Sequence, residues 1–377
     1  MSFLLVRLKA CITNIGTVFS LYLPLFLSVK RRLIVKRFIK KIIKSLIKRS
    51  AFLRRFIIRL YNAVFSDDSL PGETYDAVFT EKATCTGSTV DYFGSFLMPK
   101  EQRICELKRI FYGNCHYYLD MDNPKTFNQK IQWLKMNYYH EDFPRAVDKA
   151  EFKNYIKEKI GDGYTVPLYG VWEKENEIDF DALPNCFVLK STVQSDGKHI
   201  IVIHDKSFLD YDRLKTVLSS WLQPKNNLCS SFCSAYSKVK PRIIAEKYIQ
   251  GVDNSLVDYK FMCFNGKTEL LFVVSDRAED MSVNFYDLNW NLLPFTRKYP
   301  NAKHPVLKPK NFDKMVEIAN ILAKPFPFVR VDFYELPDGT LLIGELTFYP
   351  GGGYEPFQPV EWDYKLGDML CLPEANI

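Results

Sequence analysis

The sequence predicts an α+β protein that follows a basic, helical N-terminal region. Apolar runs of strand length recur in pairs joined by the tight-turn dipeptides Asn265-Gly266 and Asp338-Gly339, which is typical of antiparallel hairpins. Helical segments are predicted before and between these hairpins. The first 65 residues differ from the rest, because their apolar residues recur at helical spacing and all their Lys, Arg, Asp or Glu positions are Lys or Arg.

The basic charge is confined to the N-terminal region. The chain of 377 residues is 47% hydrophobic and 15% aromatic, which is typical of a globular protein and excludes a largely disordered one. Of its 51 Lys and Arg residues, fifteen lie in residues 1–65, which contain no Asp or Glu. The other 36 share the rest of the chain with 44 acids, so the net charge of +7 does not describe the body of the protein.

Residues 11–29, CITNIGTVFSLYLPLFLSV, form an uncharged stretch that is just long enough to cross a bilayer. Lys30-Arg31-Arg32 follow directly, and the basic residues beyond them are expected to stay on the cytoplasmic side. A cleaved signal peptide is the alternative, but the stretch has no small-residue cleavage site. We expect this segment either to span the membrane or to lie on it.

Residues 30–65 predict an amphipathic helix in an anionic headgroup layer, because Lys and Arg lie opposite an apolar stripe. The alternatives are a nucleic-acid arm and a core helix with a solvated face. A nucleic-acid arm does not need so regular an apolar stripe. The sequence therefore favours the cytoplasmic face of the cytoplasmic membrane, with an anionic membrane surface as partner and no nucleic acid.

Nine cysteines are scattered along the chain without paired spacing, and their number is odd. This pattern favours a reducing compartment over a disulfide framework. Cys229 and Cys233 lie close together, but no second Cys or His pair follows at the spacing of a zinc site. We interpret them as structural.

The body of the protein begins after residues 66–100, which mix acids, Gly, Pro and Thr and are interpreted as a linker or irregular cap. Thr126 and Gln129 predict a capping box for a helix within residues 123–137. Further helices are predicted over residues 148–159 and 312–323. Strands are predicted over residues 186–190, 199–204, 242–249, 258–264 and 267–274, and in a hairpin that includes residues 329–353.

The last hairpin, VRVDFYELPDGTLLIGELTFYPGGG, places two acids opposite each other. If Asp338-Gly339 is a two-residue turn, with positive φ at both positions, Asp332 faces Glu345 across the strands. Directly opposed like charges destabilise a strand pair, whereas a divalent cation between them reverses the sign of the interaction. Mg²⁺ typically takes one or two carboxylates together with substrate phosphates. The alternative is a solvated strand face.

Strand alternation extends this polar face along both strands of the hairpin. The same register pairs Arg330 with Thr347. The residues expected on the polar face are Arg330, Asp332 and Tyr334 from the first strand, and Ile343, Glu345 and Thr347 from the second.

Earlier segments supply candidates for a phosphate and nucleotide site. Lys190 ends a predicted strand and opens a polar loop, whose Ser195 and Gly197 are candidate phosphate contacts. Residues 246–249, EKYI, are suited to line a flat pocket for a base. Weaker candidates are Lys149, for phosphate, and Asp258, Lys260 and Arg277, for ribose, phosphate or an acyl substrate; a surface charge is the alternative for each.

These segments, in this order, resemble the ATP-grasp enzymes and, within them, the TupA-like (teichuronopeptide-biosynthesis) group. The resemblance covers about residues 120–371. It is carried by NPKTFNQKIQWLK, DK at 148–149, GYTVPLYGVW, LPNCFVLK, IIAEKYI, DYKFMCFNGK, SDR at 275–277, FVRVDFY and GELTFYPGGG.

The resemblance implies an ATP-grasp fold, in which two α+β lobes hold ATP. It implies a carboxylate-amine ligase that forms an acyl phosphate and then an amide, acting on a precursor of a bacterial surface polysaccharide such as a capsule. The implied roles are phosphate contact for Lys190, a frame for the adenine from Glu246, Lys247, Tyr248 and Ile249, magnesium ligation by Asp332, Glu345 and Thr347, and charge stabilisation by Arg330.

With this resemblance, the chain divides into five predicted parts. They are a membrane-associated region (1–65), a linker or cap (66–118), an N-terminal ATP-grasp subdomain (119–185), a central nucleotide-binding lobe (186–250) and a C-terminal lobe with the metal hairpin (251–377).

Two alternatives to the ligase remain. The loop after Lys190 reads Val193-Gln194-Ser195-Asp196 where the family usually has a run like His-Gly-Ser-Gly, which favours a non-catalytic nucleotide-binding scaffold. The pair Asp120-x-Asp122 resembles a pattern that holds a metal and a sugar diphosphate, which favours a membrane-associated glycosyltransferase.

Overall fold

The computed structural model describes residues 99–193, 199–222, 232–249, 257–275 and 281–377. All of them belong to one compact unit, Thr89–Ile377. The predictions for residues 1–65 and for most of the linker fall on residues 1–98, outside this part of the chain. Within the described residues, no helix combines the length and the apolar character that crossing a bilayer requires.

Among the residues that the structure describes, four helices precede the strands. α6 (Lys100–Cys115) has no counterpart among the predicted elements. α7 (Phe127–Asn137) begins at the predicted capping box, which is confirmed: Thr126 accepts a hydrogen bond from the Gln129 amide, and the Gln129 side chain accepts one from the Thr126 amide. The short α8 (Phe143–Val147) leads into α9 (Glu151–Ile160), which stops before Gly161, as predicted.

The first sheet has four antiparallel strands, in the order β1 (Leu168–Trp172), β4 (Ile243–Lys247), β2 (Phe187–Ser191) and β3 (Ile200–Ile203). One face packs against α10 (Tyr211–Trp221), because alternate apolar residues of β2 and β4 share a core with Leu214, Leu218 and Trp221 of that helix. Lys190 and Glu246 lie on the opposite face, which leaves two charged side chains away from this core.

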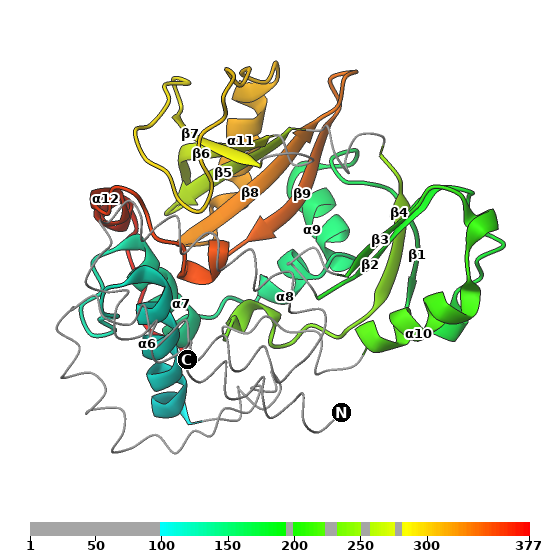
Figure 1. Cartoon of the computed structure of the whole chain (residues 1–377), viewed down its shortest axis with the longest axis horizontal. Coiled ribbons are helices and arrows are strands. Elements are labelled where there is room, and N and C mark those ends of the chain that lie inside the picture. The colour runs from blue at the N-terminus through cyan, green and yellow to red at the C-terminus, as the bar shows by residue number, and fades with distance from the viewer. Residues whose placement is uncertain (1–98, 194–198, 223–231, 250–256, 276–280) are drawn as a thin grey trace, which may run out of the picture. The chain divides into compact units, whose positions relative to one another are not determined.

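The second sheet has five antiparallel strands, in the order β7 (Ser282–Asp287), β6 (Lys267–Ser275), β5 (Asp258–Phe264), β8 (Phe328–Glu335) and β9 (Leu341–Thr347). The predicted turn between β5 and β6 is confirmed, since Asn265 and Gly266 both have positive φ, at 50° and 83°. α11 (Phe312–Ala323) covers one face of this sheet (Figure 1).

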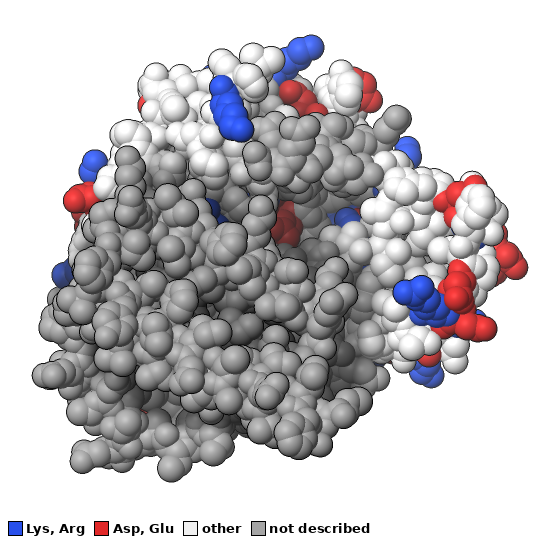
Figure 2. All heavy atoms as spheres, viewed as in Figure 1, with Lys and Arg blue, Asp and Glu red and all other residues white. Residues whose placement is uncertain are grey.

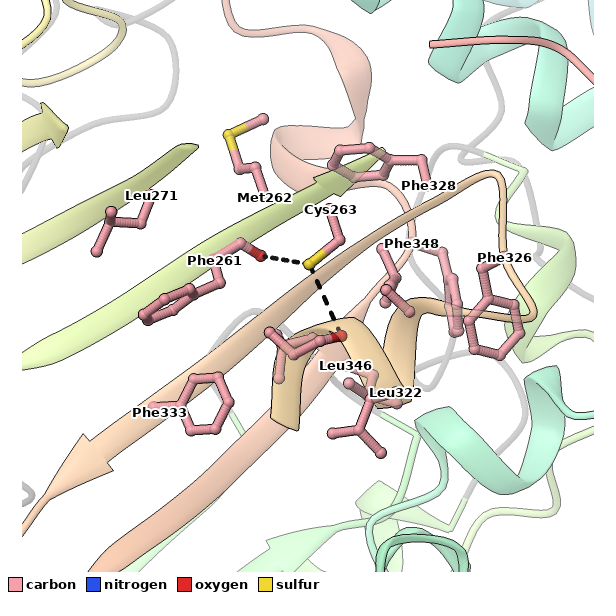
Figure 3. Packing of buried hydrophobic residues seen from close by; sticks show 14 of the residues in the cluster. Phe261, Met262, Cys263, Leu271, Leu322, Phe326, Phe328, Phe333, Leu346 and Phe348 are labelled. Carbon is pink, nitrogen blue, oxygen red and sulfur yellow. Dashed lines mark hydrogen bonds between the residues drawn. The ribbon is translucent and has the colours of Figure 1, made fainter. Parts of the chain in front are cut away.

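Aromatic side chains fill the space between α11 and the second sheet (Figure 3). Phe261 of β5 and Phe333 of β8 meet edge to face, with their ring centroids 5.2 Å apart. The Cys263 thiol lies in this core and contacts the backbone carbonyl of Phe261. The sheet face that carries Asp332 points away from this core, so the charged residues stand on a rigid, well-packed support.

The C-terminal helix α12 (Glu361–Met369) packs against α7. The buried carboxylate of Asp363 accepts hydrogen bonds from the Asn128 amide at 2.9 Å and from the Tyr117 hydroxyl at 2.5 Å. Lys130 donates to the carbonyl oxygens of Gly367 and Leu370 at 2.7 and 2.8 Å. These bonds join α7 to α12.

The β8–β9 hairpin departs from regular pairing at two places. The Leu336 amide donates to the Thr340 carbonyl at 2.9 Å, so the loop between them contains three residues and not the predicted two. Gly339 has a φ of 86°, whereas Asp338 is not among the residues with positive φ. Farther along, Gly344 is an extra residue in β9, because Asp332 pairs with Glu345 while the next residue, Phe333, pairs with Ile343.

This bulge corrects one expectation. Simple alternation placed Ile343 on the polar face with Glu345. The extra residue turns Ile343 to the other side, where it is 1% exposed in the core opposite Phe333. The polar face therefore has Glu345 and Thr347 from β9, but not Ile343.

Candidate active site

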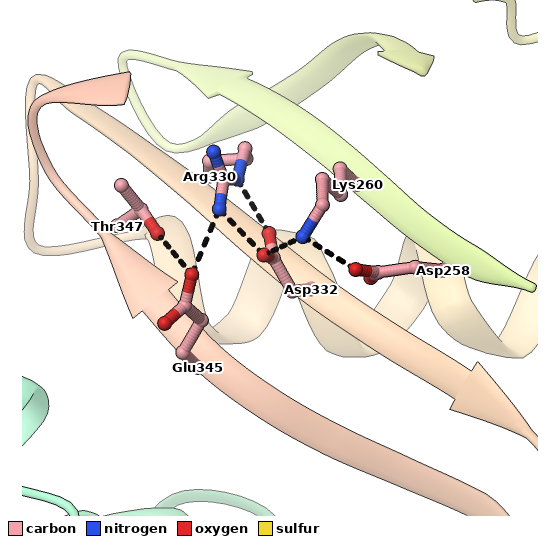
Figure 4. Close-up of polar contacts among 6 residues, drawn as sticks. All are labelled: Asp258, Lys260, Arg330, Asp332, Glu345 and Thr347. Atoms are coloured by element: carbon pink, nitrogen blue, oxygen red, sulfur yellow. Dashed lines mark hydrogen bonds and ion pairs between the residues drawn. The ribbon is translucent and has the colours of Figure 1, made fainter. Parts of the chain in front are cut away.

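Asp332 and Glu345 are cross-strand partners, and Arg330 is paired with Thr347 one step farther along (Figure 4). This is the predicted register. Asp332 is 1% exposed, whereas the Glu345 side chain keeps 37% of its surface in contact with solvent. The two acids thus occupy different environments, one buried and one facing outwards.

The side chain of Arg330 bridges the two carboxylates. Its Nε and Nη2 atoms each lie 2.6 Å from an oxygen of Asp332, and Nη2 also lies 2.9 Å from Oε1 of Glu345. Thr347 donates its hydroxyl proton to the same Oε1 atom at 3.1 Å. A planar guanidinium matches a carboxylate in this paired geometry, so Arg330 offsets the repulsion that the facing acids would otherwise experience.

Lys260 of β5 extends this network to a third acid. Its ammonium contacts Asp332 and lies 2.8 Å from Oδ2 of the buried Asp258. Burial alone would raise the pKa of Asp332, but Arg330 and Lys260 outweigh that effect and hold the pKa below its usual value. Burial likewise opposes the charge on Arg330, yet Asp332 and Glu345 hold the pKa of its guanidinium above its usual value. Asp332 and Arg330 are therefore both charged at neutral pH.

A second network lies on the first sheet and α9. Glu246 of β4 pairs with Lys190 of β2 at 2.5 Å and with Lys153 of α9 at 2.7 Å, one lysine on each carboxylate oxygen. Lys153 also donates to the Val166 carbonyl at 2.5 Å. Burial alone would raise the pKa of Glu246, but Lys190 and Lys153 outweigh it and hold the pKa below its usual value.

Lys149 lies at the entrance to α9, in a turn that is held by an ion pair. Asp148 accepts hydrogen bonds from the first amides of the helix, and Arg242 contacts its other oxygen at 2.9 Å. The Lys149 amide donates to the Thr192 carbonyl at 3.3 Å, which ties this turn to the residues just after β2. Burial lowers the pKa of Lys149, although Glu345 opposes this shift.

Both networks border one cavity of about 350 Å³. In the view of Figure 2, an acidic side chain is visible in a hollow with basic side chains beside it. The volume is in the range of pockets that hold small molecules and cofactors. The charged residues described at its wall are Lys149, Lys153, Lys190, Lys260, Arg330, Glu246, Asp258, Asp332 and Glu345.

The cavity collects many, but not all, of the predicted site residues. Lys247, Tyr248 and Ile249 do not line it: Lys247 is exposed and Tyr248 packs against the ring of His204. Ser195, Gly197 and Arg277 lie outside the described residues, so their predicted contacts stay predictions. Thr347 reaches the site through Glu345.

The predicted sugar-diphosphate motif forms a turn. Asp120 accepts hydrogen bonds from the amides of Asp122 and Asn123 at 3.0 and 2.9 Å, just before α7. Both acids are exposed, and neither lines the cavity. The local structure therefore accounts for the motif without a ligand.

The residues on β8 and β9 fit a magnesium ion that shares its coordination with a nucleotide. Carboxylate and hydroxyl oxygens are the ligands that this hard cation prefers, and Asp332, Glu345 and Thr347 supply them side by side. Among the described residues, no group of three or more His, Cys, Asp or Glu side chains is arranged to hold a metal ion. The phosphates of a bound nucleotide would have to complete such a site.

A family model described as TupA-like ATP-grasp matches residues 129–371, which is well over half of the chain. The chain belongs to this family. Its match begins in α7 and ends just after α12, so it includes both sheets and all the charged residues of the cavity. Membership in the TupA-like ATP-grasp family supports an ATP-dependent ligase activity.

Comparison with solved structures finds ATP-grasp ligases at low similarity. D-alanine-D-alanine ligase from Helicobacter pylori is 14% identical, with a TM-score of 0.38 over 67% of this chain and 69% of its own. L-amino acid ligase from Bacillus licheniformis is 13% identical, with a TM-score of 0.38 over 68% and 57%. N5-carboxyaminoimidazole ribonucleotide synthetase, solved with ADP, is 18% identical, with a TM-score of 0.33 over 58% and 49%.

The chain thus spans about half to two thirds of the length of these three structures. No curated protein matches the chain in sequence.

Sequence reasoning missed one residue at the wall of this TupA-like ATP-grasp site, Lys153, and one residue that holds the turn beside it, Arg242. Lys153 follows Lys149 by four positions, the spacing that places two side chains on one helix face, and this signal was present in the sequence. Arg242 carried no such signal, since its partner Asp148 lies 94 residues away. Only the folded structure brings that pair together.

Proposed function

We propose that this protein is an ATP- and Mg²⁺-dependent carboxylate-amine ligase that works through an acyl phosphate. The supporting observation is the arrangement of the charged residues around the cavity. Lys149, in the turn before α9, and Lys190 of β2 face a second group of cations and acids on β5, β8 and β9. A triphosphate placed between them would replace the contacts that Lys190 and Arg330 now make with carboxylates, which is how an anionic substrate binds in a preorganised site.

The proposed chemistry has two steps. An oxygen of the substrate carboxylate attacks the γ-phosphorus of ATP, and ADP leaves with the electrons of the broken bond. The amine of the second substrate then attacks the acyl carbon, inorganic phosphate leaves, and the amine loses a proton to give the amide. Lys190 and Lys149 are proposed to hold phosphate oxygens, and Arg330 to stabilise the charge on the transferring phosphoryl group.

Asp332, Glu345 and Thr347 are proposed to hold Mg²⁺ against the phosphates. The bound ion supplies positive charge that is not tied to a proton. Arg330 must release part of its hold on the two acids for this, and a flexible, always charged side chain next to phosphate is suited to the exchange.

Binding of ATP is tested by thermal unfolding. The melting temperature should rise with ATP and Mg²⁺ together, and a nucleotide at 100 times its Kd stabilises the folded state by about 2.7 kcal/mol. Glu345→Gln should reduce this rise, whereas Glu317→Gln, an exposed acid on α11, should retain it. A protein that responds to a nucleotide sugar and not to ATP would contradict the proposal and favour the glycosyltransferase.

Catalysis needs a separate test, because a scaffold would also bind ATP. Phosphate release should depend on the presence of both a carboxylic acid and an amine, and the Arg330→Ala variant should lack it. Full ATP binding without phosphate release, across a panel of acids and amines, would favour the non-catalytic scaffold.

We further propose that the substrate is a precursor of a bacterial surface polysaccharide and that the protein works at the cytoplasmic face of the membrane. The support is the sequence: the basic, apolar pattern of residues 1–65 and the resemblance to the teichuronopeptide group. Sedimentation with anionic and with neutral vesicles tests the membrane partner. Binding to anionic vesicles that is lost when residues 1–65 are removed is the expected result.

A further inference from the structure

Glu246 is held by two lysines whose surroundings differ. Lys153 contacts one carboxylate oxygen and also a backbone carbonyl, that of Val166, and its side chain is 13% exposed. Lys190 contacts the other oxygen, and its side chain is 23% exposed. Lys153 is therefore fixed by two partners, whereas the Lys190 ammonium is held, among the described residues, by Glu246.

Lys153 is also fixed through its backbone. It lies in the first half of α9, next to the core residue Phe152. Val166, its second partner, precedes β1, and β1 pairs with β4, the strand that carries Glu246. The Lys247 amide adds a bond to the Pro167 carbonyl at 3.0 Å. The helix α9, the segment before β1 and the strand β4 thus hold the Lys153 ammonium against the Glu246 carboxylate.

The two lysines share one negative charge, and this affects how firmly each is held. Leaving a buried carboxylate without a cation costs about 3–5 kcal/mol. Glu246 is 7% exposed in its side chain, so with Lys190 as its sole cation it would retain that lysine strongly. With Lys153 in place, Glu246 stays paired when Lys190 moves to another anion.

We propose that Lys153 is a positioning residue that keeps Glu246 paired and thereby frees the Lys190 ammonium for a nucleotide phosphate. The inference rests on the proposed binding of ATP. It assigns Lys153 a role that acts through Glu246 and Lys190, without contact to the substrate. Lys190 is the exchangeable member of the pair, and Lys153 is the permanent one.

The test measures the affinity of the full-length protein for ATP with Mg²⁺ and for tripolyphosphate with Mg²⁺, which lacks the base and so reports on the phosphate contacts. Lys153→Met keeps the length of the side chain and removes its charge. It should weaken both ligands about tenfold, the equivalent of about 1.4 kcal/mol. Lys153→Arg should restore the affinity. Lys157→Met, one turn later on α9 with a 63% exposed side chain, is the matched control.

The decisive comparison is made in the Glu246→Gln background, where the negative charge that traps Lys190 is absent. Glu246→Gln should bind tripolyphosphate at least as tightly as the unaltered protein, and adding Lys153→Met should have no further effect. If the Lys153→Met loss is the same in both backgrounds, Lys153 contacts phosphate itself and the proposal is wrong. An unchanged affinity of the single variant also overturns it.

Two further results are informative. If Lys153→Met does not fold, a weaker binding of tripolyphosphate by Glu246→Gln would by itself contradict the proposal, because that variant should release Lys190. If the unaltered protein binds neither ligand, the proposed ATP binding fails, and this inference fails with it.

Discussion

Arg330 donates two hydrogen bonds, each 2.6 Å long, to the carboxylate of Asp332, which lies two positions farther along the same strand. A third bond leads from the same guanidinium to Glu345 on the neighbouring strand. A cation between the facing acids was expected, and in the protein by itself a side chain supplies it. Removing that side chain should leave a site with a strong preference for another cation.

Arg330→Ala is therefore expected to respond to Mg²⁺ without nucleotide. The two carboxylates then face each other without the guanidinium between them, and a divalent ion relieves their repulsion. A stabilisation of about 1 kcal/mol would raise the melting temperature by about 2–4 °C. Arg330→Lys, which keeps a positive charge, is the control and should respond less. An equal response of both variants to millimolar Mg²⁺ would contradict this explanation.

Asp332→Asn should cost much more stability than Glu345→Gln. Asp332 is buried under two cations, and breaking such a buried pair costs about 3–5 kcal/mol. Glu345 is 37% exposed, so the corresponding loss should be about 0–1 kcal/mol. Urea denaturation gives both free energies of unfolding. Equal losses would show that the burial of Asp332 is unimportant.

Acid unfolding should reflect the lowered pKa of Asp332. Because this pKa lies below the unfolded value of about 3.9, the stabilisation from Asp332 is fully present above that pH and is lost as the pH falls through the folded pKa. The free energy of unfolding of Asp332→Asn should therefore fall less steeply below about pH 3.9 than that of the unaltered protein.

The pKa of Asp363 is shifted in the opposite direction from that of Asp332. Its burial raises its pKa, although Tyr117 and Asn128 oppose the shift. The folded state then binds this proton before the unfolded state does, so the contribution of Asp363 to stability increases as the pH falls through the raised pKa. Asp363→Asn should remove a slope of that sign. Two variants with the same pH dependence would show that the two shifts do not have opposite signs.

Gly344→Ala tests the bulge in β9. A Cβ atom at this position would lie 2.8 Å from a ring carbon of Tyr334, so either the ring or the strand must move. A loss of about 1–3 kcal/mol is expected, as for other overpacked sites. The control is Gly113→Ala in α6, where no heavy atom lies within 4 Å; it should stabilise the helix by up to about 1 kcal/mol. Similar values for both would argue against the bulge.

The register of Asp332 and Glu345 was predicted correctly from a turn that was predicted incorrectly. The loop has one residue more than the Asp338-Gly339 turn requires, and this shifts the pairing by one. Gly344 is an extra residue in β9, and it shifts the pairing back by one. Two errors of one residue cancel, so the sequence pattern led to the right partners but assigned Ile343 to the wrong face.

Most of the other correct predictions depend on local sequence signals. The capping box at Thr126 and the turn at Asn265-Gly266 depend on residues that are close in the sequence, and both are confirmed. The contacts of the two lysines with Glu246 and the Arg242–Asp148 pair join elements that are far apart in the chain. Their residue types are ordinary surface types, and only tertiary packing gives them buried partners, so a single sequence does not reveal them.

The bonds between α7 and α12 have a consequence for biosynthesis. The Asn128 amide finds its acceptor in Asp363, 235 residues later, so α7 reaches its final surroundings only after α12 has left the ribosome. Until then, the surface of α7 that packs against α12 remains open to chaperones and proteases. A premature stop codon just before α12 would therefore disturb the packing of α7 as well as remove α12.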